Sequence, residues 1–129
     1  MTGYPYRNKN MITIVCSHNK KQVEQINFNN TLAKHYLLDN DGKLKYKYIS
    51  MGYNKTKNII GIKLLKEANN PIIYKLHKTH IVSTSIRSFL KHYNLIPNKT
   101  KRYMATSRQI DGITILYANL NQPIKDYND

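Results

Sequence analysis

The chain has 129 residues and carries 21 Lys plus Arg against seven Asp plus Glu, a formal net charge of +14, while 40% of its residues are hydrophobic. That length suits one domain with a single core, and the hydrophobic fraction excludes an intrinsically disordered chain. No apolar run approaches the roughly 20 residues that a membrane helix needs, and the N-terminal stretch lacks the apolar core of a signal peptide.

The N-terminal half predicts four strands around one short helix. The β-branched run "MITIVCS" indicates a first strand that buries Cys16, and the single cysteine excludes an internal disulfide. "NNTLAKHYLL" indicates a short helix capped by Asn29 or Asn30, and "DNDG" at 39–42 is a turn. The four strands are expected at 11–17, 22–28, 44–53 and 58–65.

The C-terminal half predicts strands at 72–76 and near 80–82, followed by a helix at 85–95. In "STSIRSFLKHYNL" one of the three N-terminal hydroxyl residues caps the helix, and Pro97 ends it. Its apolar side chains recur at i, i+3, i+4 and i+7, which places them on one face. These side chains are Ile86, Phe89, Leu90 and Tyr93. "RYMATSRQIDGITILYANL" indicates a hairpin that turns at Asp111-Gly112, and 121–129 is a loose polar tail.

Two helix segments nearly repeat each other. "AKHYLL" at 33–38 and "LKHYNL" at 90–95 begin 57 residues apart, each between predicted strands. This spacing predicts a duplicated unit, with copies at about 11–65 and 72–120, although convergence in a Lys-, Asn- and Tyr-rich chain would give a similar likeness. We therefore expect an α+β, β-rich fold in which two pseudo-repeated strand–short helix–hairpin units form one compact domain over 1–129.

The positive charge is concentrated in the middle of the sequence. Between Gly42 and Ile110 lie fifteen Lys or Arg and one acid, Glu67, whereas the rest of the chain carries six of each sign. Such segregation is typical of a surface that contacts a polyanion, and nucleic acid is the expected partner. An AT-rich genome would raise the Lys content, but it does not explain why acids are missing from one segment.

The sequence gives no pattern typical of an enzyme or a metal site. His77 and His80 are three residues apart, a spacing that turns them to opposite faces of a strand, and no Cys or acid stands near them. Three of the acids are explained by turns, and the glycines form no phosphate-binding loop. We therefore expect a protein that is not an enzyme and that uses no cofactor and no metal.

Tyrosines alternate with lysines in "KLKYKYISMGYNKTK". As a strand, this segment places Lys43, Lys45 and Lys47 on one face and aromatic rings on the other. The face is either a phosphate-binding surface or the solvated side of a core strand. Tyr53 and Tyr103 stand beside basic clusters, where they can stack on exposed bases. The predicted nucleic-acid-binding residues are Lys43, Lys45, Lys47, Tyr53, Lys55, Lys57, Arg87, Lys91, Lys101, Arg102, Tyr103 and Arg108.

The segment "INFNNTLAKHYLLDNDGKLKYKYISMGYNKTKNIIGIKLL" resembles the AbrB-type swapped-hairpin DNA-binding proteins, in which a strand, a short capped helix and a turn precede a hairpin. "IVSTSIRSFLKHYNL" is similar to small uncharacterised proteins of phages and mobile elements of low-GC bacteria. Together the two segments cover about residues 22–95. The AbrB-type resemblance implies a homodimer that binds DNA.

These observations predict a non-enzymatic protein of the cytoplasm, the host cytoplasm if the protein is viral, with no membrane partner. It is expected to bind single-stranded DNA, or DNA of any sequence, because lysines favour contacts with the backbone over reading of bases. DNA is expected rather than RNA. Two alternatives stay open. One is a dimeric transcription regulator that binds duplex DNA, and the other is a phage or mobile-element protein that acts on a host nucleic-acid enzyme.

Overall fold

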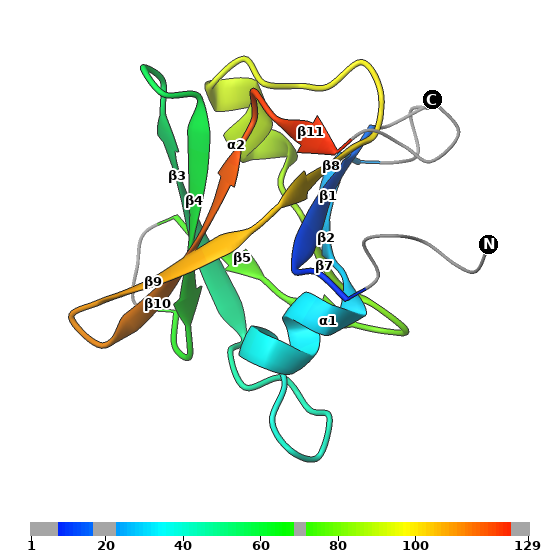
Figure 1. The fold of residues 1–129 in the computed structure, drawn as a ribbon, viewed down its shortest axis with the longest axis vertical. Helices are drawn as coiled ribbons and strands as arrows, with labels where there is room; N and C mark the ends of the chain where they lie inside the picture. The colour runs from blue at the N-terminus through cyan, green and yellow to red at the C-terminus, as the bar shows by residue number, and fades with distance from the viewer. Residues whose placement is uncertain (1–7, 17–22, 69–71, 125–129) are drawn as a thin grey trace.

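Two antiparallel sheets enclose one hydrophobic core (Figure 1). The computed structural model describes residues 8–16, 23–68 and 72–124. Strands make up 47% and helices 13% of the protein. The predicted β-rich α+β class in one compact domain is thereby confirmed. Within the described residues, no helix is long and apolar enough to cross a membrane.

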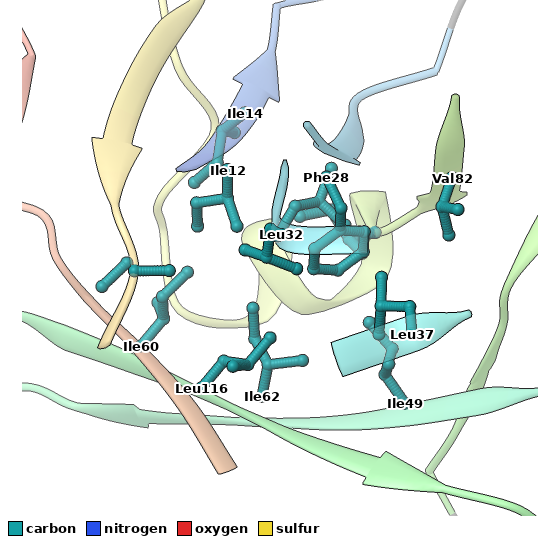
Figure 2. Packing of buried hydrophobic residues seen from close by; sticks show 14 of the residues in the cluster. Ile12, Ile14, Phe28, Leu32, Leu37, Ile49, Ile60, Ile62, Val82 and Leu116 are labelled. Carbon is teal, nitrogen blue, oxygen red and sulfur yellow. The ribbon is translucent and has the colours of Figure 1, made fainter. Parts of the chain in front are cut away.

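The first sheet has six strands in the order β11-β8-β1-β2-β7-β6. They are β1 (Met11–Val15), β2 (Gln25–Phe28), β6 (His77–Lys78), β7 (Val82–Ser85), β8 (Lys101–Met104) and β11 (Pro123–Ile124). The inward side chains of its central strands, such as Ile12, Phe28 and Val82, are fully or almost fully buried. Figure 2 shows these three side chains in the packed cluster with Ile49, Ile62 and Leu116 of the second sheet.

The second sheet has five strands in the order β5-β3-β4-β10-β9. They are β3 (Tyr48–Asn54), β4 (Ile59–Leu65), β5 (Tyr74–Lys75), β9 (Thr106–Ile110) and β10 (Ile113–Asn119). In β4 and β10 every second side chain is buried, as expected for strands with one face on the core. Only Ala105 separates β8 from β9, so one long stretch of chain passes from the first sheet to the second (Figure 1).

The first helical segment consists of α1 (Asn30–Leu32) and a π-helical turn, η1 (Ala33–Leu37). Asn29 is its cap, one of the two predicted candidates, because its Oδ1 accepts a hydrogen bond from the backbone N–H of Leu32 at 3.0 Å. The same Oδ1 accepts from the backbone N–H of Met11 at 3.1 Å. The cap therefore also ties this segment to the beginning of β1.

The second helix, α2 (Arg87–His92), is shorter than the predicted helix at 85–95. The predicted hydroxyl cap was wrong, because β7 pairs with β2 through Ser85 and holds the chain extended up to that residue. Ile86 begins the helix without a side-chain cap. At the other end, Asn94 adopts a positive φ of 58°, and the backbone N–H of Leu95 bonds the carbonyl of Leu90. The helix therefore ends before Pro97.

Other predicted boundaries also shift. The predicted strand 44–53 begins only at Tyr48. Before it, 43–47 is held by separate backbone bonds, such as that from the N–H of Lys45 to the carbonyl of Leu37. The hairpin at Asp111-Gly112 is confirmed, and both turn residues have positive φ. In the predicted loose tail, Pro123–Ile124 forms β11 and pairs with β8, whereas 125–129 lie outside the described residues, as do 17 and 22 at the ends of two predicted strands.

The strand order fits the predicted duplication. The first predicted unit contributes β1, β2, β3 and β4, and the second contributes β5, β6, β7, β8, β9 and β10. The units meet through antiparallel pairs in both sheets, β2 with β7 and β4 with β10. Two equivalent units around a local twofold axis would pair in this way. The duplication itself stays a prediction.

Candidate functional site

The face of the five-stranded sheet that points away from the core is the main candidate surface. Strand pairing and alternation place sixteen residues on it, and we call this surface the open face. The open face consists of Tyr48, Ser50, Gly52, Asn54, Ile59, Gly61, Lys63, Leu65, Lys75, Thr106, Arg108, Ile110, Ile113, Ile115, Tyr117 and Asn119. Both helices pack on the opposite, inner face, where Leu37 and Phe89 join the core cluster.

Two shallow hollows lie side by side on the open face. The larger has a volume of about 450 Å³ and the smaller about 260 Å³, and both are lined by Gly52 and Gly61. These two glycines are direct cross-strand partners in β3 and β4. Because neither has a side chain, the pleated surface is locally hollowed at this pair. The hollows therefore form one continuous groove, which we call the glycine groove.

Tyr117 forms a wall of the larger hollow. It stands directly across from Gly61 in the sheet, and its ring lies against that glycine: a Cβ added to Gly61 would meet Tyr117 Cε1 at 3.6 Å. A Cβ added to Gly52 would meet no atom within 4 Å. The Arg108 guanidinium lies 5.8 Å from the centroid of the Tyr117 ring, a cation–π distance. The groove thus combines an aromatic ring, a cation and open space.

The charge of the open face has one sign. Its sixteen residues include no Asp and no Glu, but they include Lys63, Lys75 and Arg108. Lys63 and Arg108 are the cross-strand partners of Ile115 on its two sides. The exposed Lys57, from the turn between β3 and β4, also lines the larger hollow. No carboxylate among these residues offsets the cations, and such a surface favours anionic ligands.

The structure brings three of the twelve predicted residues together at this groove, namely Lys57, Arg108 and Tyr53. The ring of Tyr53, however, packs on the inner side against the core cluster. Its hydroxyl donates a hydrogen bond of 2.6 Å to Asn58 Oδ1, and its ring centroid is 5.3 Å from that of Tyr93. The Tyr53 ring therefore lies on the core side of the sheet and is not presented in the groove.

The other predicted residues are spread over the surface. Lys43, Lys45 and Lys47 are exposed and alternate with inward-facing Leu44 and Tyr46, as predicted, although they precede β3. A further exposed group lies elsewhere, on the β3–β4 turn and on α2. It consists of Lys55, Arg87 and Lys91. Lys101 and Arg102 are partly buried in β8. The twelve residues therefore do not form one patch.

Tyr103 is a core residue. Its side chain points inward from β8, opposite Ile12 of β1, and only 6% of its surface is exposed. Burial raises the pKa of its hydroxyl above the ordinary value of 10.0, because the charged phenolate is poorly solvated there. The predicted stacking of this ring on a base was wrong, since the ring is not presented at the surface.

Arg87 has a structural partner. Its Nε lies 3.5 Å from Oε1 of Glu24, a carboxylate whose side chain is only 6% exposed. Within the described residues, this oxygen accepts no hydrogen bond. Arg87 therefore compensates a buried negative charge beside the beginning of α2, and its first role is in stability.

Replacing Arg87 by Ala is accordingly expected to lower the free energy of unfolding by about 1–3 kcal/mol, because it leaves the buried Glu24 carboxylate without its cation. Urea denaturation of the single variants Arg87→Ala and Glu24→Gln and of the double variant tests this coupling. In the Glu24→Gln background, Arg87→Ala should cost clearly less. Equal costs in both backgrounds would show that the ion pair does not stabilise the fold.

Sequence reasoning missed most of the groove, including Gly52, Gly61, Lys63 and Tyr117. The alternation of Gly61 with Lys63 in "GIKLL" and the position of Tyr117 in "TILYA" are visible in the sequence. The register that aligns Gly52 with Gly61 and Gly61 with Tyr117 joins strands far apart in the chain. A predicted hairpin of 48–54 with 59–65 could have aligned the two glycines. Nothing in the sequence indicated that Tyr117 of β10 would pair beside them.

Potential metal ligands do not gather in the part of the chain that the structure describes. Within residues 8–16, 23–68 and 72–124, no three His, Cys, Asp or Glu side chains lie close enough to hold a metal ion. Cys16 is buried, as predicted, and its Sγ lies 3.4 Å from the carbonyl oxygen of Pro97. No family model, curated protein or solved structure matches the chain. The resemblance to AbrB-type proteins therefore stays a prediction.

Proposed function

We propose that this protein binds nucleic acid without catalysing a reaction, that it acts in the cytoplasm, and that the open face is its binding surface. The observation that carries the proposal is the charge of this face: Lys63, Lys75 and Arg108 lie among apolar and small residues, with no carboxylate among its sixteen members. A polyanion gains from every cation on such a surface, and none of the sixteen residues is an acid that would repel it.

The chemistry of the face favours binding that tolerates many sequences. Lys63 and Lys75 are point charges on flexible stems, suited to phosphates rather than to the paired acceptors of a base. The rest of the groove is lined by the two glycines, by apolar and aromatic residues such as Ile59, Ile115 and Tyr117, and by a few small polar residues. Stacking and apolar contact accept any base. We therefore propose DNA of any sequence as the ligand, in agreement with the segregated charge of the chain.

The test is the dependence of binding on salt. A labelled oligonucleotide should bind more weakly as salt rises between about 50 and 200 mM, because each phosphate contact releases counterions. The double variant Lys63→Ala/Arg108→Ala should reduce the log–log slope by about 1.4 for a single strand, following the value of about 0.7 per contact. Fluorescence anisotropy titrations at several salt concentrations measure this slope.

The matched control removes the same charge elsewhere. Lys34 and Lys78 are exposed, lie on η1 and β6, and are not part of the open face. Lys34→Ala/Lys78→Ala should change the slope much less than the open-face pair. A triple Lys43→Ala/Lys45→Ala/Lys47→Ala variant tests the segment whose lysines the sequence analysis predicted to bind phosphates. Equal effects of the open-face pair and the control pair would contradict the proposed surface, and the absence of salt-dependent binding would contradict the proposed function.

A further inference from the structure

We propose that the glycine groove is a seat for unpaired nucleobases, so that the ligand class of the open face is single-stranded nucleic acid. This inference rests on the proposed function and assigns its central contact. The first base occupies the larger hollow above Gly52 and stacks on the ring of Tyr117. The neighbouring nucleotide lies over the smaller hollow, which reaches Lys63 and Ile115.

The seat is formed before any ligand arrives. The Tyr117 ring already lies over Gly61, close enough that a Cβ added there would meet Tyr117 Cε1 at 3.6 Å, so the glycine backbone covers one side of the ring. A ring held in this way loses little conformational freedom when a base stacks on it. Gly52 supplies the adjacent open space, because its position has no atom within 4 Å of a Cβ. Any side chain at Gly52 would occupy the volume that the base needs.

The cations stand where the backbone of a seated strand passes. Arg108 lies at the Tyr117 ring, with its guanidinium 5.8 Å from the centroid, and Lys63 and Arg108 flank Ile115 from neighbouring strands. Neighbouring strands lie about 4.8 Å apart, so the backbone positions of Lys63 and Arg108, one strand from Ile115 on each side, are about 10 Å apart. Arg108 and Lys63 can therefore receive the phosphates on either side of a base that has entered the larger hollow.

The size of the hollow argues against a duplex. A volume of about 450 Å³ lies within the roughly 300–1,000 Å³ of pockets for small molecules, so it suits a nucleoside and not a double helix. The bases of a duplex are already paired and stacked, and reaching the Tyr117 ring would require one of them to leave its stack. A duplex can meet only the cations at the rim of the groove.

The decisive variant fills the groove without disturbing the sheet. Gly52→Val adds a β-branched side chain to the middle of β3, where the open space accepts it and where valine favours a strand over glycine. The melting temperature should stay equal or rise. The probe is fluorescein-labelled oligo(dT) of about 20 nucleotides, which is longer than the roughly 4–16 nucleotides that a single-strand-binding OB-fold domain covers. Binding of Gly52→Val to this probe should be weaker by at least about fivefold. Binding to a duplex of the same length should change much less.

Ser83→Val is the matched control. Ser83 lies in β7 of the other sheet, so this change adds the same side chain to a strand but leaves the groove open. It should leave the affinity for oligo(dT) unchanged. Tyr117→Leu should weaken oligo(dT) binding by about fivefold to 150-fold, the range for the loss of one base–aromatic stack, whereas Tyr117→Phe should keep full affinity.

The outcomes separate the inference from the proposed function. If Lys63→Ala/Arg108→Ala flattens the salt slope while Gly52→Val and Tyr117→Leu bind oligo(dT) as the wild type does, the base seat is wrong and phosphate binding stands. Equal loss of single-strand and duplex affinity in Gly52→Val also overturns the base seat. If no variant and no wild-type protein binds nucleic acid, and Gly52→Val instead changes the oligomeric mass, the groove is a contact between copies and both proposals fail.

Discussion

Phe89→Ala is expected to lower the free energy of unfolding by about 3–5 kcal/mol, the range for removing a buried aromatic ring and leaving a cavity. Phe89 is only 5% exposed and packs with Ile86 and Leu90 in the core cluster. Its ring centroid is 5.1 Å from that of Tyr93, so the substitution also removes an aromatic pair. Urea denaturation, with the midpoint and the slope both measured, gives the change in free energy.

The size of this effect follows from the shortness of the helix. α2 has six residues, too few to be stable alone in water, so tertiary packing of its apolar face must hold it. Lys91→Ala is the matched control, since Lys91 lies on the same helix and is exposed. It should change the free energy of unfolding by no more than about 0.5 kcal/mol. Similar losses in both variants would mean that α2 does not pack through Phe89.

The fold could be predicted because its signals are local. The runs that became β4 and β10 are rich in β-branched residues and alternate between buried and partly exposed positions, and Asp111-Gly112 supplied a clear turn. The apolar spacing of Ile86, Phe89 and Leu90 gave the buried face of α2. The predicted ends of helices and strands were less accurate where tertiary contacts determine them. Ser85, for example, was predicted to lie in the helix but pairs with Gln25 of β2 and belongs to a strand.

The candidate site could be predicted only in part, because a surface is made by strands that are distant in the sequence. Lys57 and Arg108 were expected to bind nucleic acid and do lie at the groove, about fifty residues apart in the chain. Gly52 and Tyr117 carry no charge, so the distribution of charge along the sequence did not indicate them. The opposite error concerns Tyr103. It stands beside two basic residues in the sequence, yet pairing with β1 turns its ring into the core.

Tyr103→Ala is therefore expected to act on stability and not directly on nucleic-acid binding. Removing this buried ring opposite Ile12 should cost about 3–5 kcal/mol, like other aromatic truncations in a core. Thermal unfolding and urea denaturation measure the loss. Tyr103→Phe keeps the ring and serves as the control, with a much smaller change at neutral pH. A Tyr103→Ala protein that melts like the wild type but fails to bind oligo(dT) would contradict the inward position of this ring.

The raised pKa of Tyr103 makes the stability of the fold depend on pH, and comparison with Tyr103→Phe measures this contribution. In the unfolded chain the hydroxyl releases its proton near pH 10.0, whereas in the folded protein burial keeps the proton bound to higher pH. Above pH 10 the unfolded state thus binds fewer protons than the folded state, and stability falls as pH rises through the folded pKa. The contribution is fully present below pH 10. Unfolding midpoints measured between about pH 8 and 11 should fall less steeply in Tyr103→Phe than in the wild type, because phenylalanine has no proton to release. Identical slopes of the unfolding midpoint against pH in the two proteins would show that the hydroxyl of Tyr103 is solvated in the folded state. In that case Lys101 and Arg102 would again be candidates for a nucleic-acid interface that includes this ring.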